Sequence, residues 1–238
     1  MKLMAELLET AQLALFPGAP ASLSVEEVAK VLFGKSPERI ESRPAEGVQM
    51  ASVPHLGGNV QISVNPLRVD VIYQAGPSQA FDGPPVLGTK DIAGVRKWIS
   101  EITPKLLKVI PPINRAGVVV ARSEEFDTQA ASVAGFSRAV PSDVKIPGDV
   151  VELALQFNRP RPATTFAGSI NVMYAWQNLA RQDISFTNSG FSHTTKYSVR
   201  SMIDVNTPPG EPWAVAVLAT TEAPKLVCEL IDIAFKNA

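Results

Sequence analysis

The stretch from Gly88 to Ile110, GTKDIAGVRKWISEITPKLLKVI, is the strongest guide to the fold. Its apolar residues recur at steps of three and four, which is typical of one face of an α-helix. They are Ile92, Val95, Trp98, Ile99, Ile102, Leu106, Val109 and Ile110. A stripe of this width can cover a β-sheet, so we predict a long helix packed on a sheet.

Both ends of this helix carry sequence signals. Thr89 is the expected N-cap, and Asp91 places a negative charge near the unpaired N–H groups of the first turn. Two consecutive prolines, Pro111 and Pro112, are expected to end the helix. Pro104 lies inside the helical pattern, and because it lacks a backbone N–H we expect it to kink or divide the helix.

Upstream of this helix, the pattern indicates a short helix followed by antiparallel strands. Residues 3–15 fit either a short helix or a strand. Ser24 and Glu27 form a capping box, and Gly34 stands where a helix C-cap is expected, so a helix is predicted between them. Over residues 39–74 apolar residues alternate with polar ones between turn sequences, which predicts a meander with one buried face.

Downstream, the same types of element recur. Residues 113–122 are apolar on both faces, which predicts a central strand covered on both sides. Asp127 is expected to cap a helix whose inward residues are Ala130, Val133, Ala134 and Phe136. The alternation of apolar and polar residues that returns at Val150 predicts strands at 151–157, 166–176, 184–186 and 197–205. The final apolar stripe predicts a helix at 223–235.

These elements predict an α+β fold in which antiparallel sheet is covered by long helices. Residues 1–112 and 113–238 each follow the order β-α-β-meander-α, so we predict two pseudo-repeated halves in one compact unit. The repeat rests on element order, because the halves share no visible identity. The order resembles the saddle fold of the TATA-binding protein in topology only; no motif is shared, and the neutral charge argues against the same activity.

The composition and net charge limit the kinds of partner that we expect this protein to bind. The chain has 45% hydrophobic and 19% charged residues with a formal net charge of −1, as in an ordinary globular protein. A duplex-binding protein usually has a clear basic excess, so nucleic acid is not an expected partner. Residues 1–12 do not form the apolar run of a signal peptide, and no apolar segment reaches about 18 residues. We therefore expect a cytoplasmic protein without membrane contact.

Residues suited to catalysis or metal binding are few. The chain has one cysteine, Cys228, which we predict to be a buried, unreactive thiol on a helix. A zinc site would need both histidines, His55 and His193, together with carboxylates. Asp183 and Asp204 flank strand segments, which leaves a metal-dependent hydrolase or nuclease as one alternative.

Sequence motifs for catalysis and phosphate binding are also missing. The chain has no G-x-S-x-G elbow, no G-x-x-x-x-G-K-[ST] loop and no G-x-G-x-x-G fingerprint. We therefore name no catalytic residue, cofactor or metal site, and we favour a protein that is not an enzyme.

The segment from Asn158 to Pro162 is the most distinctive polar stretch. Two arginines alternate with two prolines, which predicts an extended loop. Together with Arg181, placed in the next turn, Arg159 and Arg161 could bind a carboxylate, a phosphate or an acidic partner surface. The alternative is a stiff connection whose charges only keep it hydrated.

The strands of the second half are rich in aromatic residues, namely Phe157, Phe166, Tyr174, Trp176, Phe186, Phe191 and Tyr197. On an outer sheet face they would favour a protein partner or self-association, whereas inward they would enlarge the core. Our hypothesis is a non-catalytic binding or assembly protein with its interface on these strands. The second alternative is a small-ligand binder with a pocket between sheet and helices near Trp98, Tyr174 and Trp176.

Overall fold

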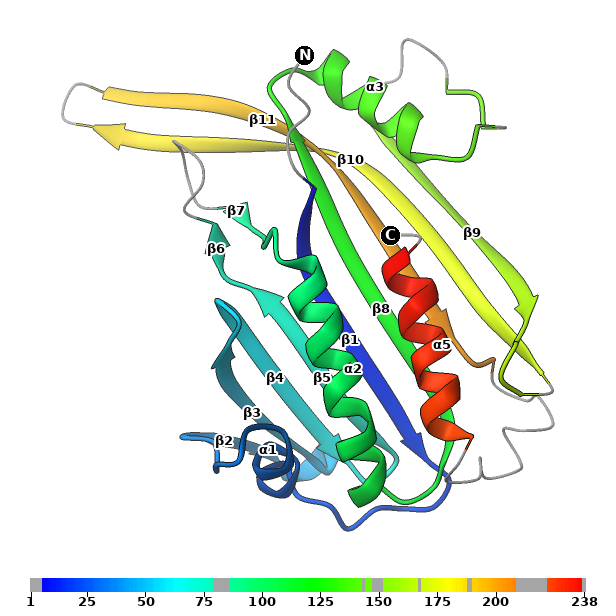
Figure 1. The fold of residues 1–238 in the computed structure, drawn as a ribbon. Helices are drawn as coiled ribbons and strands as arrows, with labels where there is room; N and C mark the ends of the chain where they lie inside the picture. Colours follow the sequence, from blue (N-terminus) through cyan, green and yellow to red (C-terminus); the bar gives the residue numbers. More distant parts are fainter. Residues whose placement is uncertain are drawn as a thin grey trace.

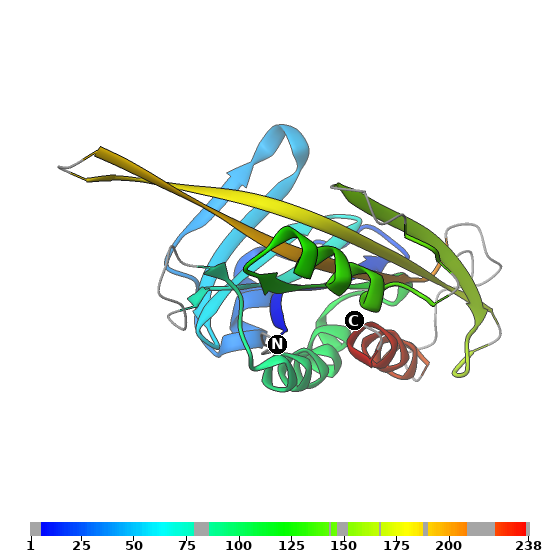
Figure 2. The same ribbon diagram turned by 90° about the horizontal axis from the view of Figure 1, so that it is seen from above.

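The computed structural model describes residues 6–78, 86–142, 144–146, 152–166, 168–187, 190–208 and 222–236. These residues form an α+β fold with a nine-stranded antiparallel sheet in the order β2-β3-β4-β5-β1-β8-β11-β10-β9. A second sheet pairs β6 with β7. Figure 1 shows the helices in front of the large sheet, and Figure 2 shows α2, α3 and α5 on the same side of it.

The first part of the chain contains β1 (Leu7–Pro17), α1 (Val25–Phe33), β2 (Ile40–Arg43), the 3₁₀ turn η1 (Pro44–Glu46), β3 (Val48–His55), β4 (Gly58–Asn65), β5 (Arg68–Ala75), β6 (Pro77–Ser78), β7 (Val86–Leu87) and α2 (Ile92–Val109). The second contains β8 (Ile113–Phe126), α3 (Gln129–Ala139), β9 (Leu153–Pro162), β10 (Ser169–Thr187), β11 (Gly190–Asn206) and α5 (Ala223–Lys236). None of the helices in the described ranges is long and apolar enough to cross a membrane.

The ambiguous N-terminal segment is a strand, β1, and it lies at the centre of the sheet. It pairs with β5 on one side and with β8 on the other. Leu13 lies opposite Val118, and both side chains are buried. Burial between two neighbouring strands therefore outweighs the helical spacing of this segment. The pairing also brings strands from residues 1–112 and 113–238 into one sheet, while the pseudo-repeat itself stays a prediction.

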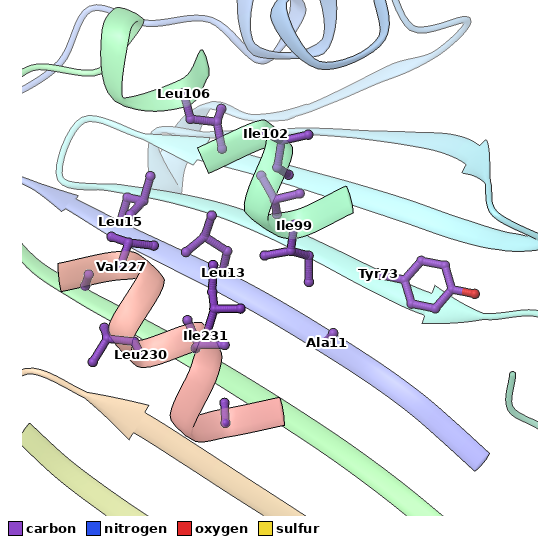
Figure 3. Packing of buried hydrophobic residues seen from close by; sticks show 14 of the residues in the cluster. Ala11, Leu13, Leu15, Tyr73, Ile99, Ile102, Leu106, Val227, Leu230 and Ile231 are labelled. Atoms are coloured by element: carbon purple, nitrogen blue, oxygen red, sulfur yellow. The ribbon is translucent and has the colours of Figure 1, made fainter. Parts of the chain in front are cut away.

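One face of the sheet, which we call the covered face, is packed against α1, α2, α3 and α5. The other face, the open face, carries no helix among the described residues. Figure 3 shows α2 and α5 side by side over the middle of the sheet, with apolar side chains between the helices and the strands; α2 contacts β1, and α5 contacts β8 and β11. The buried residues labelled there are Ala11, Leu13, Leu15, Tyr73, Ile99, Ile102, Leu106, Val227, Leu230 and Ile231. Each large aliphatic side chain buried in this way stabilises the fold by about 1.5–3 kcal/mol.

The ends of α1 confirm the prediction made from the sequence. The Ser24 hydroxyl accepts a hydrogen bond from the Glu27 N–H at 3.2 Å, and the Glu27 carboxylate accepts one from the Ser24 N–H at 2.8 Å. Gly34 closes the helix with a φ of 70°, a left-handed conformation that glycine adopts without steric cost.

Helix α2 begins at a different residue from the one predicted. Its N-cap is Asp91, whose Oδ1 accepts a hydrogen bond from the Gly94 N–H at 2.9 Å. Thr89 is not the cap, because its backbone N–H and C=O are both bonded to Leu8 of β1 at 2.9 Å. The covering helices α2 and α5 have 18 and 14 residues, so they are not the long helices that we expected.

Pro104 does not divide α2, which continues from Ile92 to Val109. The proline lies on the exposed side of the helix, so water can hydrate the carbonyl group that loses its N–H partner. Ile102 and Leu106, on either side of it, are buried in the main core. Packing against the sheet thus offsets the missing backbone hydrogen bond.

Helix α3 also differs from its prediction. Thr128 is the N-cap, not Asp127, and its hydroxyl accepts a hydrogen bond from the Ala131 N–H at 3.2 Å. Of the four residues expected to face inward, only Phe136 is buried; the other buried positions are Ser132 and Gly135. Small residues lie inward here because α3 packs closely on the second cluster of buried residues: Phe126, Phe136, Val140, Trp176 and Val199.

Gly135 sets the distance between α3 and the sheet. A Cβ atom added at this position would lie 2.2 Å from Cζ of Phe126. We expect Gly135→Ala to destabilise the protein by about 1–3 kcal/mol through overpacking, although alanine is the better helix former by about 1 kcal/mol. Urea unfolding will measure the change. Ser137→Ala, on the exposed side of the same helix, is the control and should stay within about 0.5 kcal/mol; a stabilised Gly135→Ala variant would contradict the close contact.

Candidate functional site

Strands β10 and β11 extend well beyond their neighbours in the sheet. β9 pairs with β10 only at residues 169–178, and β8 pairs with β11 only at residues 197–206. β10 and β11 nevertheless stay paired with each other as far as Thr187 and Gly190. We call residues 179–187 and 190–196 the arm. Figure 1 shows it projecting past the ends of the other large strands.

The arm is unusual because no further strand of the described chain pairs with it. Its ion pairs with the rest of the chain lie at its base, where Arg181 is 3.9 Å from Glu125 and Lys196 is 3.1 Å from Asp127. An isolated two-stranded hairpin is only marginally stable in water. It presents unpaired backbone groups along both edges, and Phe191 near its end is 74% exposed. These features are typical of an element that another molecule covers.

The predicted arginine site does not form as one cluster. Arg159 and Arg161 lie in β9, an edge strand, and not in a loop. An edge strand accepts Pro160 and Pro162 because their missing N–H groups can face the unpaired side. The Arg159 guanidinium lies 4.9 Å from the centre of the Phe157 ring.

Arg181 lies in the arm and not in a turn. Arg159 is opposite Val172, so nine residues of β10, roughly 30 Å of strand, separate Arg181 from it. Arg181 instead lies near Glu125, with 3.9 Å between Nη1 and Oε1. The three arginines therefore belong to two separate parts of the surface, and anion binding at either part stays a prediction.

The predicted aromatic pocket is also divided between two places. Trp98 lies on α2 in the main core, where its ring is 4.9 Å from His55 and 6.3 Å from Phe33. Burial lowers the pKa of His55. Tyr174 and Trp176 stack on β10 with ring centres 5.7 Å apart, and Trp176 belongs to the second cluster. These two aromatic residues enlarge the core, as one of our alternatives proposed.

A large hollow lies on the open face between the base of the arm and the ends of β4 and β5. Its volume is about 1020 Å³, and we call it the arm cleft. Its charged lining residues are Glu9, Glu125, Arg181, Lys196 and Arg200. Glu9 stands at a register shift in β1, between Leu8 and Thr10, and its Oε2 lies 2.7 Å from Nε of Arg200. A β-bulge of this kind redirects a side chain, here towards the cleft.

Two buried residues in the lining of the arm cleft are polar. Ser123 is 4% exposed and Glu125 is 7% exposed, and both come from the central strand β8. The Ser123 hydroxyl has no hydrogen-bond partner. Because basic groups surround these two residues, the cleft suits a small polar ligand that carries both donors and acceptors. Our sequence reasoning missed this site, although the charged run SEEF directly after an apolar strand was a usable signal.

A second hollow of about 560 Å³ lies between α5 and the turn that follows β9. Arg161 and Cys228 both line it. Cys228 is exposed, which contradicts our prediction of a buried thiol, because it faces this hollow instead of the core. Partial desolvation and, to a smaller extent, the Asp232 carboxylate raise the pKa of the Cys228 thiol. A thiol with a raised pKa is a poor nucleophile at neutral pH.

The carboxylates considered for metal chemistry do not come together. Asp183 is paired with Thr194 in the arm, whereas Asp204 is paired with Met173 and Val119 within the sheet. Within the part of the chain that the structure describes, no group of three or more His, Cys, Asp or Glu residues could hold a metal ion.

Comparisons with protein-family models, with curated proteins and with solved structures found no match for this chain.

Glu229 of α5 holds the turn after β9. Its carboxylate accepts hydrogen bonds from the Thr164 and Thr165 N–H groups and from the Thr165 hydroxyl, the last at 2.7 Å. Partial burial acts to raise the pKa of Glu229, but these hydrogen bonds together lower it below its ordinary value of 4.5. Because the folded-state pKa is lowered, the stabilisation is present above about pH 4.5 and is lost as the pH falls through the lowered value.

We expect Glu229→Gln to cost about 1–2 kcal/mol of stability at pH 7, since the charge-assisted hydrogen bonds are weakened. The difference from the parent protein should shrink in acid, which urea unfolding at neutral and acidic pH will measure. Glu38→Gln, at an exposed position, is the control and should cost little at either pH. A difference that does not depend on pH would contradict this role of the carboxylate.

Proposed function

We propose that this protein is a non-catalytic binding or assembly protein whose interface is formed by its second-half strands, with the arm as the main contact element. The observation that supports the proposal most directly is that β10 and β11 continue as a hairpin beyond residues 178 and 197, where their neighbours end. These segments of β10 and β11 pair with no neighbouring strand of the described chain, so their outer edges are available for pairing with a partner.

The energetics favour the same conclusion. Ordering nine residues of β10 and seven of β11 in the arm costs conformational entropy, and no third strand of the described chain pairs with the arm to offset this cost. An interface that pairs the edges and covers Phe191 would supply the missing stabilisation.

The proposal includes the pseudo-repeat, and a comparison of its two halves would single out the arm as an addition to the second half. In such a repeat β4 and β5 would correspond to β10 and β11. The first hairpin has strands of eight residues each, whereas the second has strands of 19 and 17. The two halves would therefore differ most in the arm.

Excision of the arm tests the proposal. Arg181 lies directly opposite Lys196, so residues 182–195 can be replaced by Asn-Gly, which favours a type I′ turn between these paired residues. We expect the shortened protein to keep its circular dichroism spectrum and its unfolding midpoint, and to lose association in sedimentation velocity. Unchanged association after excision would overturn the proposal.

Point variants provide a matched comparison for the excision. Phe191→Ser should weaken association, because it removes the most exposed large apolar side chain of the described residues. Leu67→Ser is the control, since Leu67 is 60% exposed in the turn between β4 and β5, away from the arm. It should leave association unchanged.

The arm cleft favours a second candidate function, the binding of a small polar ligand. The specific observation is the buried Ser123 hydroxyl, which has no partner beside a hollow of about 1020 Å³. Thermal unfolding with amino acids, nucleotides and sugars as probes should show stabilisation that rises with the logarithm of ligand concentration. Arg200→Met should abolish that stabilisation, whereas Lys35→Met, at an exposed position, should preserve it. No stabilisation by any probe would count against this candidate.

A further inference from the structure

We propose that the arm cleft binds a free α-amino acid, with the ligand carboxylate on Arg200 and Ser123 and the ligand ammonium group on Glu9. This inference rests on the second candidate function described above and names the class of ligand for the same site. It follows from unused hydrogen-bonding atoms on these three side chains, from their opposite charges and from the uncharged wall beside them.

The three side chains come from adjacent strands of the sheet. β8 lies between β1 and β11, and Ser123 of β8 is opposite Arg200 of β11. The ion pair between Arg200 and Glu9 of β1 therefore reaches across β8 at the position of Ser123. A ligand that binds to this ion pair lies directly over the serine.

The ion pair leaves hydrogen-bonding atoms of both partners unused. It joins Nε of Arg200 to Oε2 of Glu9 at 2.7 Å. Within the described part of the chain neither side chain makes a second hydrogen bond, so the two Nη groups of Arg200 and Oε1 of Glu9 are available. The side chains of Arg200 and Glu9 are 38% and 24% exposed, so a ligand in the cleft can reach both.

Ser123 adds a hydroxyl group that lacks a partner. The residue is buried, and among the described residues its hydroxyl makes no hydrogen bond. Buried polar groups in native proteins are nearly always hydrogen-bonded, so such an exception calls for a partner from outside the chain. A carboxylate held by the Nη groups of Arg200 lies beside this serine, which can donate a further hydrogen bond to it.

The opposite charges of the ion pair select the ligand. A simple anion on Arg200 is repelled by the Glu9 carboxylate, and a simple cation on Glu9 is repelled by the Arg200 guanidinium. An α-amino acid carries an ammonium group and a carboxylate on one carbon atom, so it offers each partner the opposite charge. Hydrogen bonds between charged groups are about twice as strong as those between neutral groups, and a guanidinium can bind a carboxylate through two parallel N–H groups.

The other charged residues of the lining do not change this balance. Lys196 is 3.1 Å from Asp127, and Arg181 is 3.9 Å from Glu125. Each basic group at the base of the arm therefore has an acidic neighbour. The cleft offers no excess of positive charge that would favour a simple anion over a zwitterion.

The wall next to Glu9 provides the surroundings of the amino-acid side chain. Thr10 follows Glu9 in β1 and is opposite Gln74 of β5. Gln74 is in turn opposite Asn59 of β4, and all three residues of this row line the cleft. A ligand side chain that extends along the row meets hydroxyl and carboxamide groups and no charge. Amino acids with uncharged polar side chains, such as glutamine, should therefore bind best.

Thermal unfolding with each of the twenty standard L-amino acids tests the ligand class, and isothermal titration calorimetry then measures the Kd of the one that stabilises most. Its N-acetyl derivative lacks the ammonium charge and its α-amide lacks the carboxylate charge, so each derivative should bind about tenfold or more weakly. Stabilisation by none of the twenty would overturn the proposal. Equal binding of the amino acid and either derivative would overturn it as well.

Two variants test the two ends of the ligand. Glu9→Gln should weaken binding of the amino acid about tenfold but not that of its N-acetyl derivative, whose carboxylate is no longer repelled. Ser123→Ala should weaken binding of both compounds and leave the unfolding midpoint unchanged or higher, because the lost hydroxyl has no partner in the unliganded protein. Glu38→Gln, at an exposed position, is the control and should change neither affinity. A Glu9→Gln protein that still discriminates fully between the two compounds would overturn the role of Glu9.

The results separate this inference from the functions proposed above. If nucleotides or sugars stabilise the protein through Arg200 and amino acids do not, the cleft binds a small polar ligand but the amino-acid class is wrong. If no probe stabilises the protein, the second candidate function fails together with this inference. Association through the arm is measured separately by sedimentation velocity and does not depend on either result.

Discussion

The pairing of β1 with β8 is the constraint on which the rest of the structure depends. β1 is bonded to β5 on its other side and β8 to β11, so this one junction fixes the positions of strands from both ends of the chain. Leu15 lies opposite Ala116, and both side chains are buried on the face of the sheet that the helices cover. A slip of one residue would exchange the covered and open faces of a strand, so burial fixes the register strongly. α2 and α5 then pack side by side over the junction.

The two faces of the sheet have different chemistry, and the difference explains where binding surfaces occur. The covered face is a nearly continuous apolar layer. The open face carries polar contacts even close to the junction: the Gln12 amide donates to Asp70 at 2.7 Å, and the Arg68 guanidinium lies 2.7 Å from the same carboxylate. Helices therefore complete the first face, whereas the second offers hydrogen-bonding groups, the arm cleft and the base of the arm to other molecules.

The sequence predicted the parts of the fold that depend on local patterns. The capping box at Ser24, most of the stripe of α2 and the alternation in β4 each follow from neighbouring residues and were predicted correctly; Val109, at the end of the stripe, is exposed. The N-caps of α2 and α3 were placed one or two residues too early, and the other errors and the open choice for β1 depend on contacts between distant residues. Pairing with β5 and β8 makes β1 a strand, packing keeps α2 helical through Pro104, and an edge position allows Arg159 and Arg161 to lie in β9. The candidate site was the least predictable, because the arm cleft is assembled from four or more strands.

The buried Arg122 of β8 contacts residues near both ends of the described chain. Its guanidinium donates to the Phe235 carbonyl at 2.7 Å and lies 3.1 Å from the Glu6 carboxylate. During synthesis, β1 therefore cannot complete its pairing before β8 has been made. The apolar layer on the covered face stays incomplete until α5 has left the ribosome. Contacts between residues this far apart in sequence slow folding and prolong the exposure of apolar strands. The sheet and its helical layer are thus completed only once α5 has been synthesised, and the strands made earlier are exposed to non-native pairing until then.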